Sequence, residues 1–461
     1  MLNYKEFLRY NRFMNINDEY TAIVEKLTNE GAGLSRIGGF VVFVENACTY
    51  DRVKIKIKKI TKNYALATIV EIIDPSPYRI QPFCPMQKVC GACQLQFIDY
   101  NYQLEIKRQI VQDTMHSIGG FDIEIPLPVA SPETRHYRHK IQYPISQTKN
   151  SKRILAGYYK PSSHEIVNIK YCPIQPEICD RIIEFVRDHA FDYGISGFNE
   201  KKHTGELRHV VIRNSVSGDN LVTLVINATK PFGRLIDFAR AIYSEFKEVT
   251  GVCINFNSKK TNVIMGSKTE CIIGKEHIEE HILDKKFLIS ADTFFQVNPK
   301  SAENIFRYVK DYILNNFEKP LVLDAYAGIS AFGICVADVS GMVVSIEENL
   351  KSVELAHKTA KINNIQNIEI HGGDAGEYFA KESRKFDVII LDPPRKGCTK
   401  ESLDEAFKLC QNTIIYVSCN PATLARDLKY LKEKGCSIES IQPFDMFCHT
   451  YHIENVAIIK V

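Results

Sequence analysis

The segment VKIKIKKI, residues Val53–Ile60, alternates apolar and basic residues. Because successive side chains of a strand point to opposite faces, this pattern predicts a strand with one face in a core and Lys54, Lys56 and Lys58 on the other. Such a strand is either a solvated sheet edge protected by its lysines or part of a small β-barrel with a basic nucleic-acid face. The short apolar runs and turn residues around it, over residues 16–75, predict further strands.

A proline-rich linker is expected at DPSPYRIQP, and a second proline-bearing break, EIPLPVASPE, is expected to precede a middle region rich in strands. The stretch DYNYQLEIKRQIVQDTMHSI has apolar residues at helical spacing and predicts a helix that packs on one side. Farther on, LRHVVIRNSVSGDNLVTLVINA has a turn cluster between two apolar runs and predicts a hairpin.

From about Lys286 the pattern changes to alternating helices and strands. NPKSAENIFRYVKDYILNNF predicts an amphipathic helix with Asn298 as N-cap and Pro299 at its first position. The apolar strands that follow alternate with helical segments, which predicts an α/β fold with a doubly wound parallel sheet. Ligands of such sheets bind beyond the carboxyl ends of the strands. Polar residues at successive strand ends therefore predict a site there: Asp324, Glu347, Asp374, Asp392 and Cys419.

Composition and charge are those of an ordinary globular protein. The chain has 461 residues, 45% hydrophobic and 25% charged, a length that suits about three domains. The net charge of +3 neither indicates nor excludes a nucleic-acid partner, because a local basic patch is averaged away. With no signal peptide and no apolar run near the ~20 residues of a membrane span, we expect a cytoplasmic protein whose cysteines stay reduced.

A group of cysteines in CPMQKVCGAC predicts a metal centre. Cys84, Cys90 and Cys93 are spaced C-x5-C-x2-C, and Cys172 is the first choice for a fourth ligand, with Cys179 the weaker one. Four thiolates suit zinc or an iron–sulfur cluster. The spacing lacks the paired C-x2-C of zinc ribbons and the C-x3-C-x2-C of radical S-adenosylmethionine enzymes, which disfavours both.

The segment LVLDAYAGISAFG, residues 321–333, reads as strand, glycine-containing loop and helix. Gly328 and Gly333 allow the backbone to approach a ligand closely, and Glu347 lies where an acid can bind ribose hydroxyls. An acid at the strand end, Asp324, suits a ligand with a cationic end, such as S-adenosylmethionine, better than a phosphate. In VIILDPPRKG the two prolines stop a strand and fix Asp392 toward the methyl donor or its acceptor.

Cys419 lies in IIYVSCNPATLARDL, between an apolar run and a helix predicted to have Asn420 as N-cap and Pro421 at its first position. A helix N-terminus can lower the pKa of a nearby thiol. Taken alone, this cysteine can be a nucleophile, a metal ligand or a small buried residue. The polar residues at the neighbouring strand ends favour a functional role.

Together these motifs resemble one family, the S-adenosylmethionine-dependent RNA 5-methyluridine methyltransferases, in particular the branch that acts on 23S ribosomal RNA. EGAGLSRIGGFVVFVENA is similar to the start of its RNA-binding TRAM barrel, and CPMQKVCGACQLQ with Cys172 to its [4Fe–4S] site. His139 in YRHKIQY stands where the family usually has Asn, and Cys448 in DMFCHTYHIENV where it usually has Pro. Further matching motifs are FFQVNP, DAYAGISAFG, LDPPRKG and SCNPATLARDL.

The resemblance implies a Rossmann-like methyltransferase domain preceded by two other parts. The implied division is an N-terminal extension at 1–15, a TRAM-like or OB-like β-barrel at 16–75, a β-rich central domain with an iron–sulfur site at 76–285, and the methyltransferase domain at 286–461.

The resemblance also implies a reaction, the methylation of carbon 5 of a uridine. Cys419 would add to carbon 6 and Glu454 would remove the proton from carbon 5, with Asp392 in the same catalytic set. Contacts to the methyl donor S-adenosylmethionine are implied for Gln296, Tyr326, Gly328, Glu347, Asp374 and Asp392. A [4Fe–4S] cluster is implied at Cys84, Cys90, Cys93 and Cys172. RNA contacts are expected at Arg138, Lys140, Lys54 and Lys56.

RNA is the expected partner, 23S ribosomal RNA first and transfer RNA second, and the protein is expected to be a monomer without a membrane contact. An RNA 5-methylcytosine methyltransferase is disfavoured because the turn after Asp392 reads DPPR, where those enzymes usually carry a second catalytic cysteine in a Pro-Cys motif. A non-catalytic RNA-binding protein with a structural cluster is the alternative from another class, and the set of Cys419, Asp392 and Glu454 argues against it.

Overall fold

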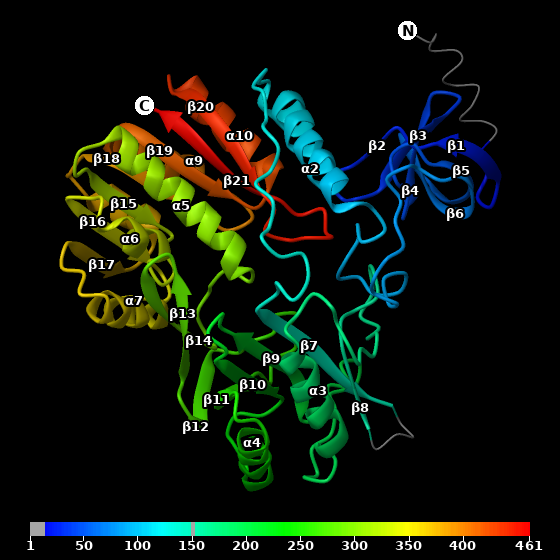
Figure 1. Ribbon diagram of the computed structural model, residues 1–461, viewed down its shortest axis with the longest axis horizontal. Coiled ribbons are helices and arrows are strands. Elements are labelled where there is room, and N and C mark those ends of the chain that lie inside the picture. The colour runs from blue at the N-terminus through cyan, green and yellow to red at the C-terminus, as the bar shows by residue number, and fades with distance from the viewer. Residues whose placement is uncertain (1–13, 149–152) are drawn as a thin grey trace.

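The computed structural model describes residues 14–148 and 153–461. The protein has three parts, each built on its own large sheet: an N-terminal barrel, a central domain and a C-terminal α/β domain (Figure 1). In the described part of the chain, no helix is long and apolar enough to cross a membrane. The N-terminal extension predicted at residues 1–15 lies outside the described residues, except for its last two.

The N-terminal part is a six-stranded sheet with the order β1-β5-β6-β4-β3-β2. The alternation predicted in β5 is present, because Val53, Ile55 and Ile57 are fully buried while the lysines between them are not. β5 pairs with β1 on one side and β6 on the other, so the interpretation as a lysine-protected edge is wrong. The strands are β1 (Glu19–Ile23), β2 (Lys26–Leu27), β3 (Gly33–Ile37), β4 (Phe40–Glu45), β5 (Arg52–Ile60) and β6 (Tyr64–Asp74).

The central domain is built on a second six-stranded sheet, with the order β12-β11-β10-β9-β7-β8. The predicted hairpin is present as the antiparallel pair β9–β10, and α4 connects β10 to its parallel neighbour β11. Apolar residues of α3 and α4 pack together against this sheet. The elements are β7 (Lys140–Gln147), β8 (Ile154–Ala156), α3 (Glu177–His189), β9 (Leu207–Asn214), β10 (Asn220–Ile226), α4 (Gly233–Glu245), β11 (Val249–Phe256) and β12 (Lys268–Gly274).

The C-terminal domain confirms the predicted doubly wound sheet. Its strand order is β17-β16-β15-β18-β19-β21-β20, and β21 runs antiparallel to both of its neighbours. Helices α5, α6 and α7 contribute to the core on one face, and α8, α9 and α10 to the core on the other. The elements are α5 (Pro299–Asn316), β15 (Leu321–Ala325), α6 (Ala331–Val336), β16 (Met342–Glu347), α7 (Leu350–Ile362), β17 (Ile368–Gly372), α8 (Ala375–Lys381), β18 (Phe386–Leu391), α9 (Lys400–Leu409), β19 (Cys410–Ser418), α10 (Pro421–Glu433), β20 (Ser437–Phe444) and β21 (Glu454–Lys460).

The predicted helix starts are present in this domain. The side chain of Asn298 caps α5 by accepting a hydrogen bond from the Ser301 amide, with Pro299 at the first position. Asn420 caps α10 in the same way, through the Ala422 amide. The hairpin of β13 (His277–Ile282) and β14 (Lys285–Ser290) precedes α5 and packs its apolar residues into the C-terminal core.

Helix α2 (Tyr100–Thr114) joins the barrel to the C-terminal domain, with a short π-helix, Met115–Gly119, at its end. Ile106 and Ile110 pack into the barrel core, whereas Val111 and Met115 pack into the core beneath α10. Figure 1 shows α2 between the barrel and the last strands of the C-terminal sheet. The helix thus contacts both outer parts of the molecule.

Candidate active site

A single cavity of about 1030 Å³ lies beyond the carboxyl ends of β15, β16, β18 and β19. This main cavity brings together residues that the sequence had predicted from separate motifs. Among the residues that line it are Gln296, Tyr326, Gly328, Glu347, Asp374, Asp392, Cys419 and Glu454. The predicted nucleophile, the predicted base and the predicted donor contacts therefore face one space.

The pairing of β19 with β21 brings Cys419 and Glu454 together. These strands are antiparallel, and Ser418 at the end of β19 lies opposite Asn455 near the start of β21. Cys419 follows Ser418 and Glu454 precedes Asn455, so the two functional residues come next in the same register. The amide nitrogen of the Asn455 side chain also donates to the Ser418 carbonyl, at 3.3 Å.

The thiol of Cys419 has a raised pKa, about 11. Burial is the main cause, followed by the nearby Glu454 carboxylate, with a further contribution from Asp392. The guanidinium of Arg395 acts in the opposite direction. In the free enzyme, burial and two acids thus outweigh the lowering expected from the N-terminus of α10.

The two carboxyl groups near the thiol also hold their protons more tightly than usual. Burial raises the pKa of Asp392 to about 7. The pKa of Glu454 is well above its ordinary value, because of burial first and then Asp392, whereas Arg395 lowers it. Shifts of this kind at a cavity are typical of groups that transfer protons.

The turn after β15 has a strained backbone conformation. It lines the main cavity beside the residues predicted to contact the methyl donor. Tyr326, Gly328 and Ser330 have φ values of 63°, 57° and 58°, in the left-handed region. The Gly328 amide donates to Glu347 at 2.8 Å, and Glu347 also accepts from the Asn349 amide at 2.8 Å. A Cβ on Gly328 would meet no protein atom within 4 Å, so packing within the protein allows a larger residue there and the φ is what favours glycine.

Two expectations for this turn are wrong. The Asp324 carboxylate is fully buried outside the lining of the main cavity and accepts from the Gly333 amide at 2.9 Å, so it holds the start of α6 and not a cationic ligand. Burial raises its pKa to about 7. Gly333 does not face a ligand either, because a Cβ there would lie 2.5 Å from the Ser345 hydroxyl.

A second cavity, of about 220 Å³, reaches Cys419 from the side of the barrel. Asn29 and Glu30 of the barrel line it, together with Ile110 and Thr114 of α2. On the catalytic side it is lined by Arg395, Cys419, Tyr451 and His452. We call it the barrel-side cavity. The thiol therefore lies between a space shared with the predicted donor residues and a space shared with the barrel.

Sequence reasoning missed several residues of these cavities. Arg395 lines both and interacts with Cys419 and Glu454, although it directly follows the Asp-Pro-Pro turn that drew attention to Asp392. Phe447 lines the main cavity, and its signal was the same motif that contains Glu454. The position of these residues next to quoted motifs is the signal that could have found them.

A third cavity, of about 610 Å³, adjoins the main cavity and shares Phe294 and Asn349 with it. We call it the lysine cavity, because Lys140, Lys268 and Lys351 line it. Lys140 lies directly across the sheet from Arg213, and Arg213, then desolvation, lowers the pKa of Lys140 well below its ordinary value. Glu276 and Asp292 line the same cavity, so its walls carry both signs of charge.

The four predicted cysteine ligands come together in one small cavity. Cys84, Cys90, Cys93 and Cys172 line it, and the other three thiols act on the pKa of Cys93. Cys179 is elsewhere, fully buried in the central core with its thiol donating to Asn214, so the weaker candidate is wrong. Among the described residues, no three His, Cys, Asp or Glu side chains are arranged to hold a single metal ion.

Arg138 lies beside this cysteine cluster. Desolvation lowers its pKa, but Tyr158, Tyr137 and the thiols of Cys93 and Cys172 raise it, and the net direction is upward. Its Nε is buried without a hydrogen-bond partner among the described residues. A guanidinium with one unpaired buried nitrogen beside two of the four thiols fits a negatively charged group held by the cysteines.

The barrel lysines predicted to contact RNA lie on the open face of β5. Lys54 is about half exposed and forms an ion pair with Glu19 at 2.8 Å. Lys56 lies opposite Glu19 in the strand register. Part of the positive charge of this face is therefore balanced within the barrel.

Comparisons with known proteins cover almost the whole chain. A family model described as tRNA (Uracil-5-)-methyltransferase matches residues 99–460, and a TRAM domain model matches residues 15–70. An uncharacterized RNA methyltransferase of Bacillus cereus is 36% identical over 449 residues, which cover 96% of this chain and 97% of the relative. Another, from Gloeobacter violaceus, is 36% identical over 444 residues, which cover 95% and 96%.

A solved structure has a similar fold over the same length. It is the Pyrococcus abyssi tRNA (uracil-54, C5)-methyltransferase in complex with S-adenosyl-L-homocysteine. The TM-score is 0.75 at 27% sequence identity, with 95% of this chain and 100% of that chain covered. The arrangement of barrel, central domain and methyltransferase domain is thus shared with that enzyme.

Proposed function

The chain belongs to the tRNA (uracil-5-)-methyltransferase family and is an S-adenosylmethionine-dependent RNA (uracil-C5)-methyltransferase, and we propose that Cys419 is its nucleophile and Glu454 its general base. The observation that carries this assignment is the β19–β21 register, which brings both residues to one cavity. The acids and the arginine around them perturb the same two groups, as expected for a proton-transfer site.

The chemistry explains why a thiol and an acid are needed. S-adenosylmethionine supplies a methyl group on a positively charged sulfur. Carbon 5 of uracil is a poor nucleophile until the Cys419 thiolate adds to carbon 6, which gives carbon 5 carbanion character. After carbon 5 has taken the methyl group, Glu454 accepts its proton, the electron pair reforms the 5,6 double bond, and the thiolate leaves. Arg395 favours the ionised form of both groups.

We propose that the donor binds in the main cavity along the strained turn after β15. Glu347 keeps acceptor capacity on both carboxylate oxygens for ribose hydroxyls, since each accepts one backbone amide. Gln296, Tyr326, Gly328, Asp374 and Asp392 line the same space and would complete the contacts. The acids of this lining suit a ligand with a net positive charge.

Two variants test the assignment of the catalytic pair. Cys419→Ala should abolish formation of 5-methyluridine while RNA still binds, which a filter-binding assay measures. Glu454→Gln should still add to carbon 6 and methylate carbon 5 but fail to remove the proton, so that a covalent RNA–protein adduct accumulates on a denaturing gel. Full activity of the first variant, or only free protein with the second, would contradict the respective assignment.

We further propose that Cys84, Cys90, Cys93 and Cys172 hold a [4Fe–4S] cluster. All four thiols line one small cavity, and the resemblance of the cysteine motif favours a cluster over a single zinc ion. In such a cluster each thiolate binds a different iron. Arg138 would then balance the negative charge of the cluster, which takes it away from the phosphate contact expected from the sequence.

Metal analysis of the protein purified without oxygen tests this proposal. We expect about four iron and four sulfide per chain and a brown colour, and loss of both in Cys172→Ser. Cys179→Ser is the matched control and should keep its iron, because Cys179 lies outside the cluster. A colourless protein with one zinc per chain would overturn the proposal.

RNA is the substrate, and we propose 23S ribosomal RNA as its source, with transfer RNA as the alternative. The support for ribosomal RNA is the resemblance of the barrel and cysteine motifs to that branch. The shared domain layout does not favour it, because the Pyrococcus abyssi structure with the same layout is that of a transfer-RNA enzyme. Lys140 in the lysine cavity, and Lys54 and Lys56 on the barrel, are proposed to contact RNA phosphates.

Mapping of 5-methyluridine in both RNAs from a strain that lacks this gene decides the target. A missing methyl group in 23S RNA that returns with the wild-type gene, but not with Cys419→Ala, supports the proposal. A loss confined to transfer RNA would show that the alternative is right.

A further inference from the structure

The loop of residues 445–453 connects β20 to β21 and carries groups to both cavities at Cys419. Phe447 lines the main cavity, Tyr451 and His452 line the barrel-side cavity, and Glu454 follows the loop directly. The position of this loop therefore decides where the proposed base and the walls around the thiol lie.

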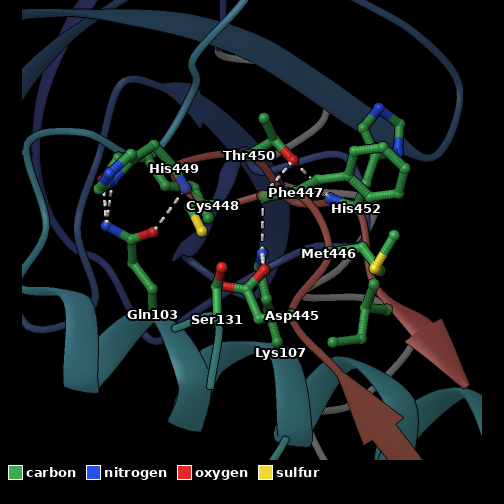
Figure 2. Close-up of polar contacts among 12 residues, drawn as sticks. Gln103, Lys107, Ser131, Asp445, Met446, Phe447, Cys448, His449, Thr450 and His452 are labelled. Atoms are coloured by element: carbon green, nitrogen blue, oxygen red, sulfur yellow. Dashed lines mark hydrogen bonds and ion pairs between the residues drawn. The ribbon is translucent and has the colours of Figure 1, made fainter. Parts of the chain in front are cut away.

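Side chains from outside the C-terminal sheet hold the backbone of this loop (Figure 2). Lys107 of α2 donates to the Phe447 carbonyl at 3.1 Å, and Gln103 of α2 accepts from the His449 amide at 3.1 Å. Tyr137 donates to the Cys448 carbonyl at 2.9 Å. Asn298, the N-cap of α5, donates to the Met446 carbonyl at 3.2 Å.

Gln103 also fixes the ring of His449. Its amide nitrogen lies 3.2 Å from Nδ1, and Nε2 lies 2.9 Å from the Thr134 carbonyl, which can only accept. Nε2 therefore carries the proton and Nδ1 accepts from Gln103. Burial lowers the pKa of His449 to about 4, so the ring stays neutral and this arrangement holds at neutral pH.

The ion pair between Lys107 and Asp445 is the unusual part of this network. Both side chains are fully buried, and Nζ lies 2.6 Å from Oδ1. The second oxygen of Asp445, Oδ2, is buried without a partner among the described residues. Because burial of two charges costs several kcal/mol each, such a pair is a poor device for stability and is better explained by the geometry it fixes.

The same helix contacts the other side of the reaction centre. Ile110 of α2 packs into the barrel core. Ile110 and Thr114 both line the barrel-side cavity. Lys107 is one turn before Ile110, on the face that meets the loop. One rigid helix thus sets the distance between the barrel, the loop and the cavity that opens on Cys419.

We propose that Lys107 is a positioning residue for methyl transfer. Through Asp445 and the Phe447 carbonyl it holds the 445–453 loop so that Phe447 and Glu454 face the ring that Cys419 attacks. The proposal rests on the proposed function of Cys419 and Glu454 and adds that the base is positioned from α2, outside the methyltransferase sheet.

Paired variants separate positioning from folding. Lys107→Met leaves Asp445 buried without a partner and should lower the melting temperature strongly. Lys107→Met/Asp445→Asn removes both charges and should recover most of that temperature. Neither variant restores the bond to the Phe447 carbonyl, so both should lose about 100-fold in kcat, the size of effect expected from a displacement of about 1 Å. The dissociation constant of S-adenosylmethionine, measured by calorimetry, should stay within about two-fold.

The controls keep the outcomes distinct. Arg108→Met, on the next residue of α2, removes an exposed ion pair with Glu105 and should change neither kcat nor melting temperature. Recovery of wild-type kcat in the double variant would show that the pair serves folding alone, and loss of donor binding in both variants would show a collapsed site; either overturns the proposal. Activity of Cys419→Ala, measured in parallel, would instead refute the proposed function.

Two thiols of the lysine cavity lie opposite each other on neighbouring strands. Cys253 of β11 and Cys271 of β12 are directly opposite in an antiparallel pair and line the same cavity. Directly opposite residues have Cα atoms about 4.5–5.5 Å apart, within the range that a disulfide spans. Cys271 is exposed on the edge strand, whereas Cys253 is buried. The interaction between the two thiols lowers the pKa of Cys271 and raises that of Cys253, so Cys271 ionises first.

We infer that Cys253 and Cys271 form a reversible disulfide with a thiol oxidant such as glutathione disulfide. The Cys271 thiolate attacks one sulfur of the oxidant and expels a glutathione thiolate. The Cys253 thiol, as its thiolate, then attacks the Cys271 sulfur of the mixed disulfide and expels the second glutathione. The protein loses two electrons and two protons, and the oxidant becomes two glutathione thiols.

Peptide mapping tests this inference in the full-length enzyme. After treatment with glutathione disulfide and blocking of free thiols, trypsin should release residues 248–259 linked to residues 269–275. Cys253→Ser should instead carry glutathione on Cys271, and Cys271→Ser should carry no modification at Cys253. The inference would be overturned if Cys253 and Cys271 are both still free, and therefore alkylated, in the treated wild-type enzyme while glutathione disulfide has reacted with other cysteines.

Discussion

At the scale of single residues, the reactivity of Cys419 is a balance of opposing effects. The sequence predicted a thiol activated by the N-terminus of α10, whereas burial and Glu454 raise its pKa to about 11. A thiol with a pKa so far above neutral is almost entirely protonated at pH 7 in the free enzyme. Arg395 is the nearby group that lowers the pKa of Cys419. The sequence pattern did not reveal this role, because β21, far along the chain, brings Glu454 to the same place.

The pH dependence of catalysis follows from these shifts. Cys419 reacts as the thiolate and Glu454 as the carboxylate, and both have raised pKa values, so the active forms of both increase with pH. We expect kcat/KM, which reports the free enzyme, to rise about ten-fold or more per pH unit between pH 6 and 8, without a plateau. Steady-state methylation at limiting RNA measures it, and a flat profile in this range would contradict the prediction.

Removal of Arg395 should make this balance worse. In Arg395→Gln the pKa values of Cys419 and Glu454 both rise, so kcat/KM at pH 7 should fall about ten-fold or more, because each pKa unit costs ten-fold in the reactive form. Lys396→Gln is the matched control, since Lys396 also lines the main cavity but is not among the main causes of either pKa shift. Equal losses in both variants would mean that only the charge of the cavity matters.

At the scale of elements, the sequence predicted what depends on local patterns. The alternation in β5, the caps at Asn298 and Asn420 and the strands with Asp324 and Asp392 at or next to their ends are all set by neighbours in sequence, and the structure confirms them. The antiparallel insertion of β21 beside β19 depends on contacts far apart in the chain, and so does the packing of α2 on barrel and loop. No periodicity indicates such contacts.

The sequence predicted a glycine-containing loop after β15 but not its backbone conformation, which a substitution can test. Gly328→Ala would place a side chain at a φ of 57° without a clash against other protein atoms, so the cost to the free enzyme of about 1–2 kcal/mol is one of backbone conformation. Because this turn holds Glu347, the affinity for S-adenosylmethionine should fall about 5- to 30-fold. Gly218→Ala, with φ of 97° and equally open space in the β9–β10 turn, should lower stability without changing that affinity.

At the scale of the whole molecule, the barrel and the methyltransferase domain meet at Cys419, and the central domain adjoins the main cavity. The main cavity belongs to the methyltransferase domain, the lysine cavity lies between that domain and the central domain, and the barrel-side cavity between it and the barrel. Since RNA is the substrate, a flipped uridine at Cys419 would leave its flanking nucleotides near the barrel and α2. We therefore expect RNA to contact surfaces of the protein that are far apart in its sequence.

The barrel lysines are where this expectation can be measured. Lys56→Gln/Lys58→Gln removes two charges from the open face of β5, and RNA affinity should fall with a salt dependence reduced by about one unit of slope per phosphate contact. Lys54→Gln should do less, because Glu19 already engages Lys54. Lys247→Gln, an exposed charge that follows α4 in the central domain, controls for net charge. RNA affinity should be measured between 50 and 200 mM salt. Loss of a direct phosphate contact lowers the slope of log affinity against log salt concentration. If only the net charge matters, all four substitutions should have the same effect per charge removed.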